Sequence, residues 1–336
     1  MAPHNWLNAR GVVAIGASAG GIDALQRLMR DLPEDLQAAI CIVLHLPASS
    51  HSLLAQIIAR QTRLPVSQAV AGERLRAGHV YVAPPDWHLL VRAAHVHLDR
   101  GPKENGVRPA VDALFRSLAD AYGECGVAVV LSGSLSDGAT GAGAVAAAGG
   151  SVLVQLPEDA VVPSMPEAAL DAVPNATALT AEELAEEIAR RAAAFTDAST
   201  EEQPRSANSG GSGMEASRET MSGPPSSFSC PECHGPLWER GGGAAIRYRC
   251  RVGHAFSEEV LLDAKGSAVE AALWMALEAL EERSELLEKV AGRLDAAGRD
   301  RSATRLRRRA AGAAQRAELI RGVLTVDETP VEGVST

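Results

Sequence analysis

The sequence predicts an α/β fold: a doubly wound, mostly parallel sheet with an antiparallel hairpin extension, followed by a small cysteine-containing unit and C-terminal helices. Two observations lead to this prediction. Strongly apolar runs of strand length alternate with helical segments between residues 11 and 180, as in parallel sheets that helices cover on both faces. Beyond residue 200 the composition turns first to Ser, Gly and Pro and then to Ala, Glu, Leu and Arg.

Each element of the first part follows from its local pattern. Continuous apolar runs predict buried strands, and apolar residues at helical spacing predict the helices between them. The expected strands are 11–15, 38–44, 127–131 and 151–155, and the expected helices are 22–30, 53–60 and 139–148. Segments 79–82, 87–91 and 96–98 alternate in polarity between turn residues, which predicts the antiparallel hairpin extension at the sheet edge.

Composition changes mark the expected domain boundaries. A first domain covers residues 1–195, and the Ser/Gly/Pro/Glu-rich segment 196–227 reads as a flexible linker because it cannot bury enough apolar surface to fold. Residues 228–256 form a candidate zinc-binding unit. Residues 257–325 are expected to form a helical hairpin or coiled coil, and 326–336 a flexible C-terminus. Leucines recur there at heptad spacing, at Leu273, Leu280, Leu287 and Leu294.

The overall composition excludes several classes of protein. A formal net charge of -10 argues against a nucleic-acid-binding surface as the main function. The N-terminus lacks the apolar run of a signal peptide, and no segment offers the roughly 18 apolar residues of a membrane span. We therefore expect a cytoplasmic protein with no membrane insertion, in which Cys41 and Cys125 are buried thiols within apolar strands.

The turn after the first strand, GASAGG at 16–21, has two interpretations. A dinucleotide fingerprint would need glycine where Ser18 stands, and an acidic residue after the second strand, which ends instead at His45. A nucleophile turn needs small neighbours around an exposed serine, and the helix N-terminus beside Ser18 can stabilise an oxyanion. The second interpretation fits better, although a merely tight turn has a comparable weight for this motif alone.

Two further side chains follow strands of the same predicted sheet. His45 follows the second strand, and Asp137 lies in the loop after strand 127–131. The carboxyl ends of parallel strands meet at one edge, so both can face Ser18. Neutral imidazole can take the serine proton, and a carboxylate can hold the ring and stabilise the imidazolium. Asp137 could instead be a helix N-cap, and His45 a structural histidine. Because Ser18, His45 and Asp137 all follow strands of one predicted sheet, a Ser18–His45–Asp137 triad is favoured.

Five blocks, in their order, resemble the bacterial chemotaxis protein-glutamate methylesterase family of the CheB type: IGASAGG (15–21), CIVLHLP (41–47), GHVYVAPPDWHLLV (78–91), NGVRPAVDALFRSLA (105–119) and LSGSLSDGATG (131–141). The resemblance covers about residues 10–190. It implies hydrolysis of glutamate methyl esters on chemoreceptor helices to glutamate and methanol, and in some members deamidation of receptor glutamines. It places Ser18, His45 and Asp137 at the family's triad positions.

The resemblance also implies roles for three other residues. Ala19 and Ser134 occupy oxyanion or pocket positions where the family commonly has Thr and Met, and backbone N–H groups would survive these changes. Arg108 would help to receive the acidic receptor segment, with a structural role equally weighted. The chain begins about ten residues before the first catalytic strand, so we expect a receiver-less enzyme that phosphorylation in cis cannot control.

The cysteine-containing unit has the spacing of a metal site. Cys230 and Cys233 form C-x2-C, and Cys250 and His254 form C-x3-H, which together predict a Cys3His structural zinc in a zinc-ribbon-like unit. His234 competes with His254, but its adjacency to Cys233 makes simultaneous ligation awkward. Unmetallated thiols are the weaker alternative, and no cofactor is expected for catalysis.

These inferences converge on a stand-alone methylesterase whose partner is a methylated chemoreceptor or receptor-like array. The alternatives are a catalytically impaired signalling scaffold that keeps the fold and, less favoured, a nucleotide-binding domain. Because a flexible linker transmits little force, the tail is expected to lie outside the active site. Its heptad leucines predict helical self-association or tethering to a receptor array.

Overall fold

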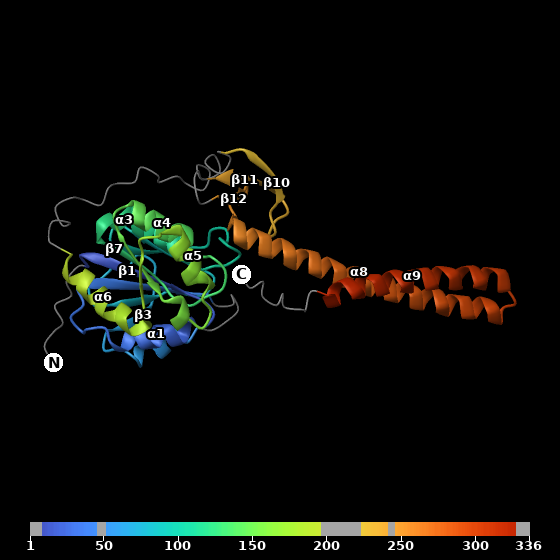
Figure 1. The fold of residues 1–336 in the computed structure, drawn as a ribbon, viewed down its shortest axis with the longest axis horizontal. Coiled ribbons are helices and arrows are strands. Elements are labelled where there is room, and N and C mark those ends of the chain that lie inside the picture. The colour runs from blue at the N-terminus through green and yellow to red at the C-terminus, as the bar shows by residue number, and fades with distance from the viewer. Residues whose placement is uncertain (1–8, 46–51, 196–222, 241–245, 327–336) are drawn as a thin grey trace, which may run out of the picture. The chain divides into compact units, whose positions relative to one another are not determined.

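The structure is a computed structural model that describes residues 9–45, 52–195, 223–240 and 246–326 (Figure 1). The chain divides into two compact units, residues 1–261 and 262–336. The expected flexible C-terminus, apart from residue 326, and all of the expected linker up to residue 222 lie outside the described residues. The last part of that expected linker is structured, because strand β10 begins at Pro225.

A seven-stranded sheet forms the centre of the first unit, and every pair of neighbouring strands in it is parallel. Its spatial order is β3-β4-β2-β1-β7-β8-β9. The strands are β1 (Gly11–Ala17), β2 (Ala38–Leu44), β3 (Val66–Gln68), β4 (Val80–Val82), β7 (Gly126–Val130), β8 (Ser151–Gln155) and β9 (Thr177–Leu179). All residues of β1, β2 and β7 are buried, as the apolar runs predict for strands covered on both faces.

Helices cover both faces of this sheet, which makes the fold doubly wound (Figure 1). Alternate strand residues face opposite sides: Val13 and Ile15 pack with one set of helices, and Val12 and Ala14 with the other. The first set is α1 (Gly21–Arg30), α2 (Leu54–Ala59) and α6 (Ala181–Ala193), and the second is α3 (Val111–Tyr122), α4 (Ala139–Ala147) and α5 (Ser164–Ala172).

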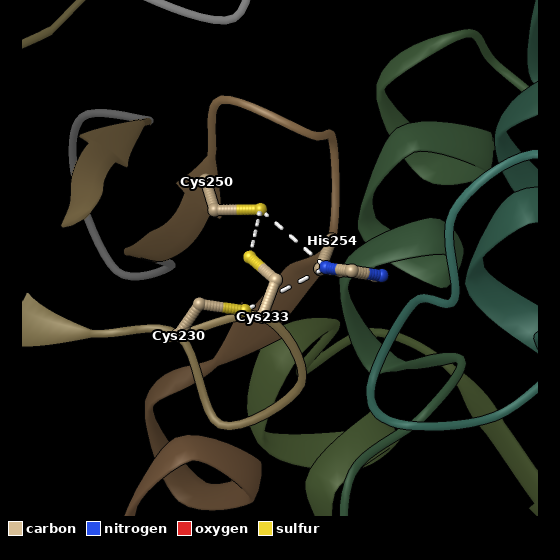
Figure 2. Close-up of side chains that lie close together, drawn as sticks. All are labelled: Cys230, Cys233, Cys250 and His254. Carbon is tan, nitrogen blue, oxygen red and sulfur yellow. Dashed lines mark hydrogen bonds between the residues drawn. The ribbon is translucent and has the colours of Figure 1, made fainter. Parts of the chain in front are cut away.

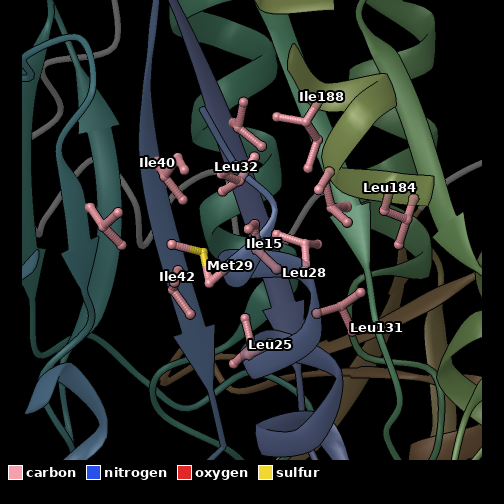
Figure 3. Packing of buried hydrophobic residues seen from close by; sticks show 14 of the residues in the cluster. Ile15, Leu25, Leu28, Met29, Leu32, Ile40, Ile42, Leu131, Leu184 and Ile188 are labelled. Carbon is pink, nitrogen blue, oxygen red and sulfur yellow. The ribbon is translucent and has the colours of Figure 1, made fainter. Parts of the chain in front are cut away.

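The first of these two cores shows how the sequence pattern becomes packing (Figure 3). Leu25, Leu28 and Met29 recur at helical spacing along α1, and all three are completely buried against the sheet. Burying one such side chain stabilises the fold by roughly 1.5–3 kcal/mol. This packing fixes where α1 begins, and therefore where the turn between β1 and α1 lies.

The predicted fold class is confirmed, with one correction to its hairpin. Strands β5 (His88–Arg92) and β6 (His95–Asp99) form an antiparallel pair, as expected from segments 87–91 and 96–98. Segment 79–82 does not join that pair. Its strand β4 pairs in parallel with β2 on one side and β3 on the other, so Val80–Val82 is a buried strand of the main sheet. Short alternating sequences do not reveal such a distant partner.

The cysteine-containing unit is a four-stranded antiparallel sheet in the order β10-β11-β12-β13. Its strands are β10 (Pro225–Ser229), β11 (Pro236–Arg240), β12 (Arg247–Cys250) and β13 (Ala255–Ser257). A small apolar core holds the sheet together, with Leu237, Tyr248 and Phe256 buried in it. This four-stranded sheet belongs, together with the parallel sheet, to the first compact part of the chain, residues 1–261.

Two long helices, α8 (Glu258–Ala296) and α9 (Asp300–Val326), follow. The heptad leucines of α8 are half-buried, and Leu277 and Ala291 between them are buried. In α9 the buried positions are alanines: Ala303, Ala310, Ala313 and Ala317. Polar contacts join the two helices, including Arg321 with Glu281 and Ser284 Oγ with Ala310 O at 3.0 Å. The leucine seam therefore has a partner within the chain. Among the described residues, no helix combines the length and apolar character needed to cross a membrane.

Candidate active site

Ser18 and His45 emerge from neighbouring strand ends. The register of β1 and β2 pairs Ala17 with Leu44, so the next residue of each strand leaves the sheet side by side, about 4.8 Å apart in strand spacing. The His45 N–H donates to the Ala17 carbonyl at 3.2 Å, and the Ser18 N–H donates to the Ser132 carbonyl at 2.9 Å. The second bond ties Ser18 to the loop that follows β7 and contains Asp137.

Small residues allow the close turn at Ser18. Gly20 has a φ of 75°, a left-handed conformation that glycine adopts without strain, and α1 starts directly after it. A Cβ on Gly133 would lie 2.8 Å from Ser18 Cβ and 2.1 Å from Met165 Sδ, so only glycine fits beside this serine. Ala19 and Ser134 are exposed next to Ser18 and Gly133. Their backbone N–H groups are the candidate oxyanion donors, together with the positive end of α1.

His45 and Asp137 form a direct hydrogen bond, Nε2 to Oδ2, at 2.8 Å. The carboxylate is buried, with 3% of its side chain exposed. Its oxygens also accept hydrogen bonds from the Val111 N–H at 2.7 Å and the Asp112 N–H at 3.2 Å. Burial alone would raise the pKa of Asp137, but the bonds from His45 and the surrounding donors outweigh it and lower that pKa. Asp137 is therefore an anion that orients the His45 ring through its bond to Nε2.

Sequence reasoning missed two buried side chains next to Asp137. Asn105 Nδ2 donates to Asp137 Oδ1 at 2.9 Å and to Asp112 Oδ2 at 3.2 Å. Asp112 is completely buried and accepts hydrogen bonds from the N–H groups of Gly138 (3.2 Å) and Gly141 (2.7 Å). Burial and the neighbouring Asp137 raise the pKa of Asp112, while Arg247 opposes them. Both missed residues lie in the block 105–119. Asp112, an acidic residue in the apolar first turn of α3, was an available signal, whereas Asn105 lies in the turn before the helix and gave none.

Arg108 is engaged inside the domain. Its guanidinium binds Asp86 Oδ1 through Nε at 3.0 Å and Nη2 at 2.6 Å, and donates to the carbonyls of Arg100 and Gly101. Those partners use most of its five donors. This arrangement favours the structural alternative for Arg108 over a contact with substrate.

The four expected metal ligands lie together (Figure 2). Their ligand atoms all lie within 4.8 Å of one another, and the described residues place His254 in this group, whereas His234 is outside it. His254 Nδ1 lies 3.7 Å from Cys230 Sγ and 3.5 Å from Cys250 Sγ, and Cys233 Sγ lies 3.6 Å from Cys250 Sγ. A zinc tetrahedron with bonds of about 2.3 Å to sulfur has sulfur–sulfur edges of about 3.8 Å. The residues therefore fit a tetrahedral zinc ion.

The first unit is therefore a doubly wound α/β domain with a candidate catalytic triad of a serine, a histidine and an aspartate near the carboxyl edge of its parallel sheet. Residues 13–188, just over half of the chain, match the family described as CheB methylesterase. The chain belongs to the CheB methylesterase family. The solved catalytic domain of the CheB methylesterase from Thermotoga maritima is similar in structure, with a TM-score of 0.52 and 34% identity, over 54% of this chain and 97% of that one.

Curated relatives are also similar over this region. A Methanosarcina acetivorans protein named protein-glutamate methylesterase/protein-glutamine glutaminase 2 is 39% identical over 165 residues, which are 47% of this chain and 46% of the relative. A Myxococcus xanthus protein of the same description, number 4, is 41% identical over 157 residues, 46% of this chain and 44% of the relative. The chain thus spans about half the length of the curated relatives it matches. The cysteine-containing unit of strands β10 to β13, from here on the Cys3His unit, lies outside the matched region, as do the two long helices.

Proposed function

We propose that this chain is a protein-glutamate methylesterase that hydrolyses glutamate O5-methyl esters on chemoreceptor-like proteins to glutamate and methanol. The observation that carries the proposal is the 2.8 Å bond between His45 Nε2 and buried Asp137, directly beside the strand end that presents Ser18. The family of the chain and the names of its relatives supply the substrate class. Those names also include glutaminase activity, which uses the same acyl chemistry with ammonia as the leaving group.

In the proposed mechanism, Ser18 Oγ attacks the ester carbonyl while its proton passes to His45 Nδ1. Asp137 holds the imidazolium in place through Nε2. The tetrahedral oxyanion is stabilised by backbone N–H groups at Ala19 and Ser134, whose side chains are then free to vary. Methanol leaves with the proton from His45, and an acyl bond joins the glutamyl carbonyl to Ser18. Water then loses a proton to His45, attacks that carbonyl and restores both the carboxylate and Ser18.

We infer further that the Cys3His cluster holds a structural zinc and that catalysis uses no cofactor. The sulfur and nitrogen spacings support this assignment, because a closed four-ligand shell leaves no open position for substrate. Methylated chemoreceptor helices or a receptor-like array are the proposed partners, and cytoplasm is the proposed location. Tethering to such an array remains our proposal for the long helices, whereas self-association is less favoured because α9 already packs on the leucine face of α8.

Methanol release tests the proposed function. Full-length protein should release methanol from a receptor fragment that carries glutamate methyl esters, and the same fragment before methylation should give none. If the fragment also carries glutamine, ammonia release measures the glutaminase reaction separately. No methanol from a methylated receptor at stoichiometric enzyme would contradict the proposal and favour the scaffold alternative.

A further inference from the structure

The edge of the Cys3His unit pairs with the segment that leads into the candidate active site. Strand β13 is the outer strand of the unit, and on its free side it meets Glu104 and Asn105. The Asn105 N–H donates to the Ala255 carbonyl at 2.7 Å, and the Ala255 N–H donates to the Lys103 carbonyl at 3.4 Å. Backbone pairing of this kind fixes the register between the two segments.

Asn105 continues this contact to the proposed triad. Its Oδ1 accepts a hydrogen bond from the Ser257 N–H at 2.9 Å, and its Nδ2 donates to Asp137 Oδ1 at 2.9 Å. One amide therefore joins the backbone of the Cys3His unit to the carboxylate that orients His45. Asn105 is buried and has a φ of 52°, a left-handed conformation that Asn adopts more readily than most residues.

The loop that contains Asp137 makes two more contacts with the unit. Leu135 packs against its apolar core, which includes Tyr248 and Phe256. Ser136 Oγ lies 2.9 Å from Ser257 Oγ, within hydrogen-bond distance. The two residues that precede Asp137 are thus held by side chains of the Cys3His unit.

The unit also supplies charge. Arg247 of β12 donates to Glu104 Oε2 at 2.9 Å and lies 3.4 Å from Asp112 Oδ2. Burial would raise the pKa of Glu104, but the charges of Arg116 and Arg247 outweigh it and lower that pKa. The charged and titratable groups around this cluster are acidic or basic. The acidic groups are Glu104, Asp112 and Asp137, and the others are Arg116, Arg247, Arg249, His45 and His88. Arg116 and Arg247 both form ion pairs with carboxylates of this buried cluster.

We propose that the Cys3His unit positions the catalytic aspartate, with Asn105 and Arg247 as the positioning residues. This inference rests on the proposed function, because it assigns the unit a role in the same Ser18–His45–Asp137 reaction. It also corrects the expectation that the whole tail lies outside the active site: Ser257 is one side chain away from Asp137. Positioning residues act on the chemical step and leave substrate binding unchanged.

Steady-state kinetics on a short methyl-glutamyl peptide test the proposal. Asn105→Asp keeps an acceptor for Ser257 but places a carboxylate where Asp137 now receives a donor. We expect kcat to fall about 10- to 100-fold with KM unchanged, as for the loss of one hydrogen bond to a charged group. The acid limb of the kcat/KM profile should move to higher pH, because added negative charge favours the imidazolium. Arg247→Gln, which removes a positive charge, should move it in the same direction.

Three variants separate positioning from a merely structural role. Arg251→Gln removes the same charge from an exposed turn of the same unit and should leave kcat and the profile at wild-type values. Arg247→Lys keeps the charge and should restore the position of the acid limb. If Asn105→Asp does not fold, Asn105→Gly accepts the left-handed φ, keeps the backbone bond to Ala255 and should show the same loss of kcat.

A spectroscopic measurement keeps the proposal independent of turnover. The hydrogen-bonded His45 Nε2 proton should give a low-field NMR signal, identified by its loss in His45→Ala, that shifts or broadens in Asn105→Asp and Arg247→Gln. Absence of methanol release by wild-type protein would contradict the proposed function, and this signal would still test the link. Unchanged kcat, pH profile and His45 signal in both variants would overturn the proposal, as would equal effects in Arg251→Gln.

Discussion

Replacing Ser18 by alanine should lower methanol release from a methylated receptor by several orders of magnitude and leave the fold intact. Ser18 lies at the end of β1, where its backbone N–H bonds to Ser132 and its carbonyl accepts the Gly21 N–H. Both bonds survive the substitution. What disappears is the hydroxyl that we propose as the nucleophile, so only the ~10³–10⁴-fold acceleration over water from oxyanion donors and binding should remain.

The control for this variant is another serine of the same sheet. Ser67 lies on edge strand β3, and its hydroxyl contacts His79 at 2.9 Å, so Ser67→Ala should keep wild-type turnover. The circular dichroism spectra of both variants should match that of the wild type, and their melting temperatures should lie within a few degrees of it. Turnover in Ser18→Ala within tenfold of wild type would refute Ser18 as the nucleophile.

Replacing Cys250 by serine should abolish metal binding and unfold the Cys3His unit. Cys250 Sγ lies within 3.6 Å of Cys233 Sγ and 3.5 Å of His254 Nδ1, so its loss opens the tetrahedral shell. Structural zinc contributes about 10–16 kcal/mol of apparent binding free energy in small zinc units, where it is folding free energy. Elemental analysis should find about one zinc per chain in the wild type and none in this variant.

This variant also has a catalytic consequence. The sequence alone led us to expect a tail outside the active site and catalysis without a cofactor. The bonds through Asn105 instead predict that turnover falls at least as far as in Asn105→Asp. Cys125→Ser is the matched control, since Cys125 lies outside the cluster and this variant should keep its zinc. Wild-type protein purified without chelator that contains no zinc would contradict the assignment.

Sequence patterns within single segments were sufficient to predict the buried strands and the polar residues that follow them. The apolar runs of β1 and β2 predicted fully buried strands, and the polar residues that follow them, Ser18 and His45, could be placed at one sheet edge from the fold rule alone. Strand β4 was misassigned because its neighbours β2 and β3 come from other parts of the chain. Periodicity describes one segment and does not report its partners.

The contacts of the Cys3His unit could not be predicted for the same reason. Its ligand spacing is a local signal, but the pairing of Arg247 with Glu104 joins residues from opposite sides of the expected linker. The heptad leucines of α8 similarly predicted a helical partner without identifying it. The alanines of α9 fill that role, and because alanine is common in exposed helices as well, their spacing alone was a weak signal.

Covalent labelling shows whether Ser18 is the nucleophile. Full-length protein is incubated with a serine-directed phosphonate, digested, and mapped by mass spectrometry, with His45→Ala as the variant that lacks the base. We expect a single adduct on Ser18 in the wild type, formed in parallel with loss of methanol release, and far slower labelling of His45→Ala. An adduct on another serine, or complete inactivation without modification of Ser18, would contradict it.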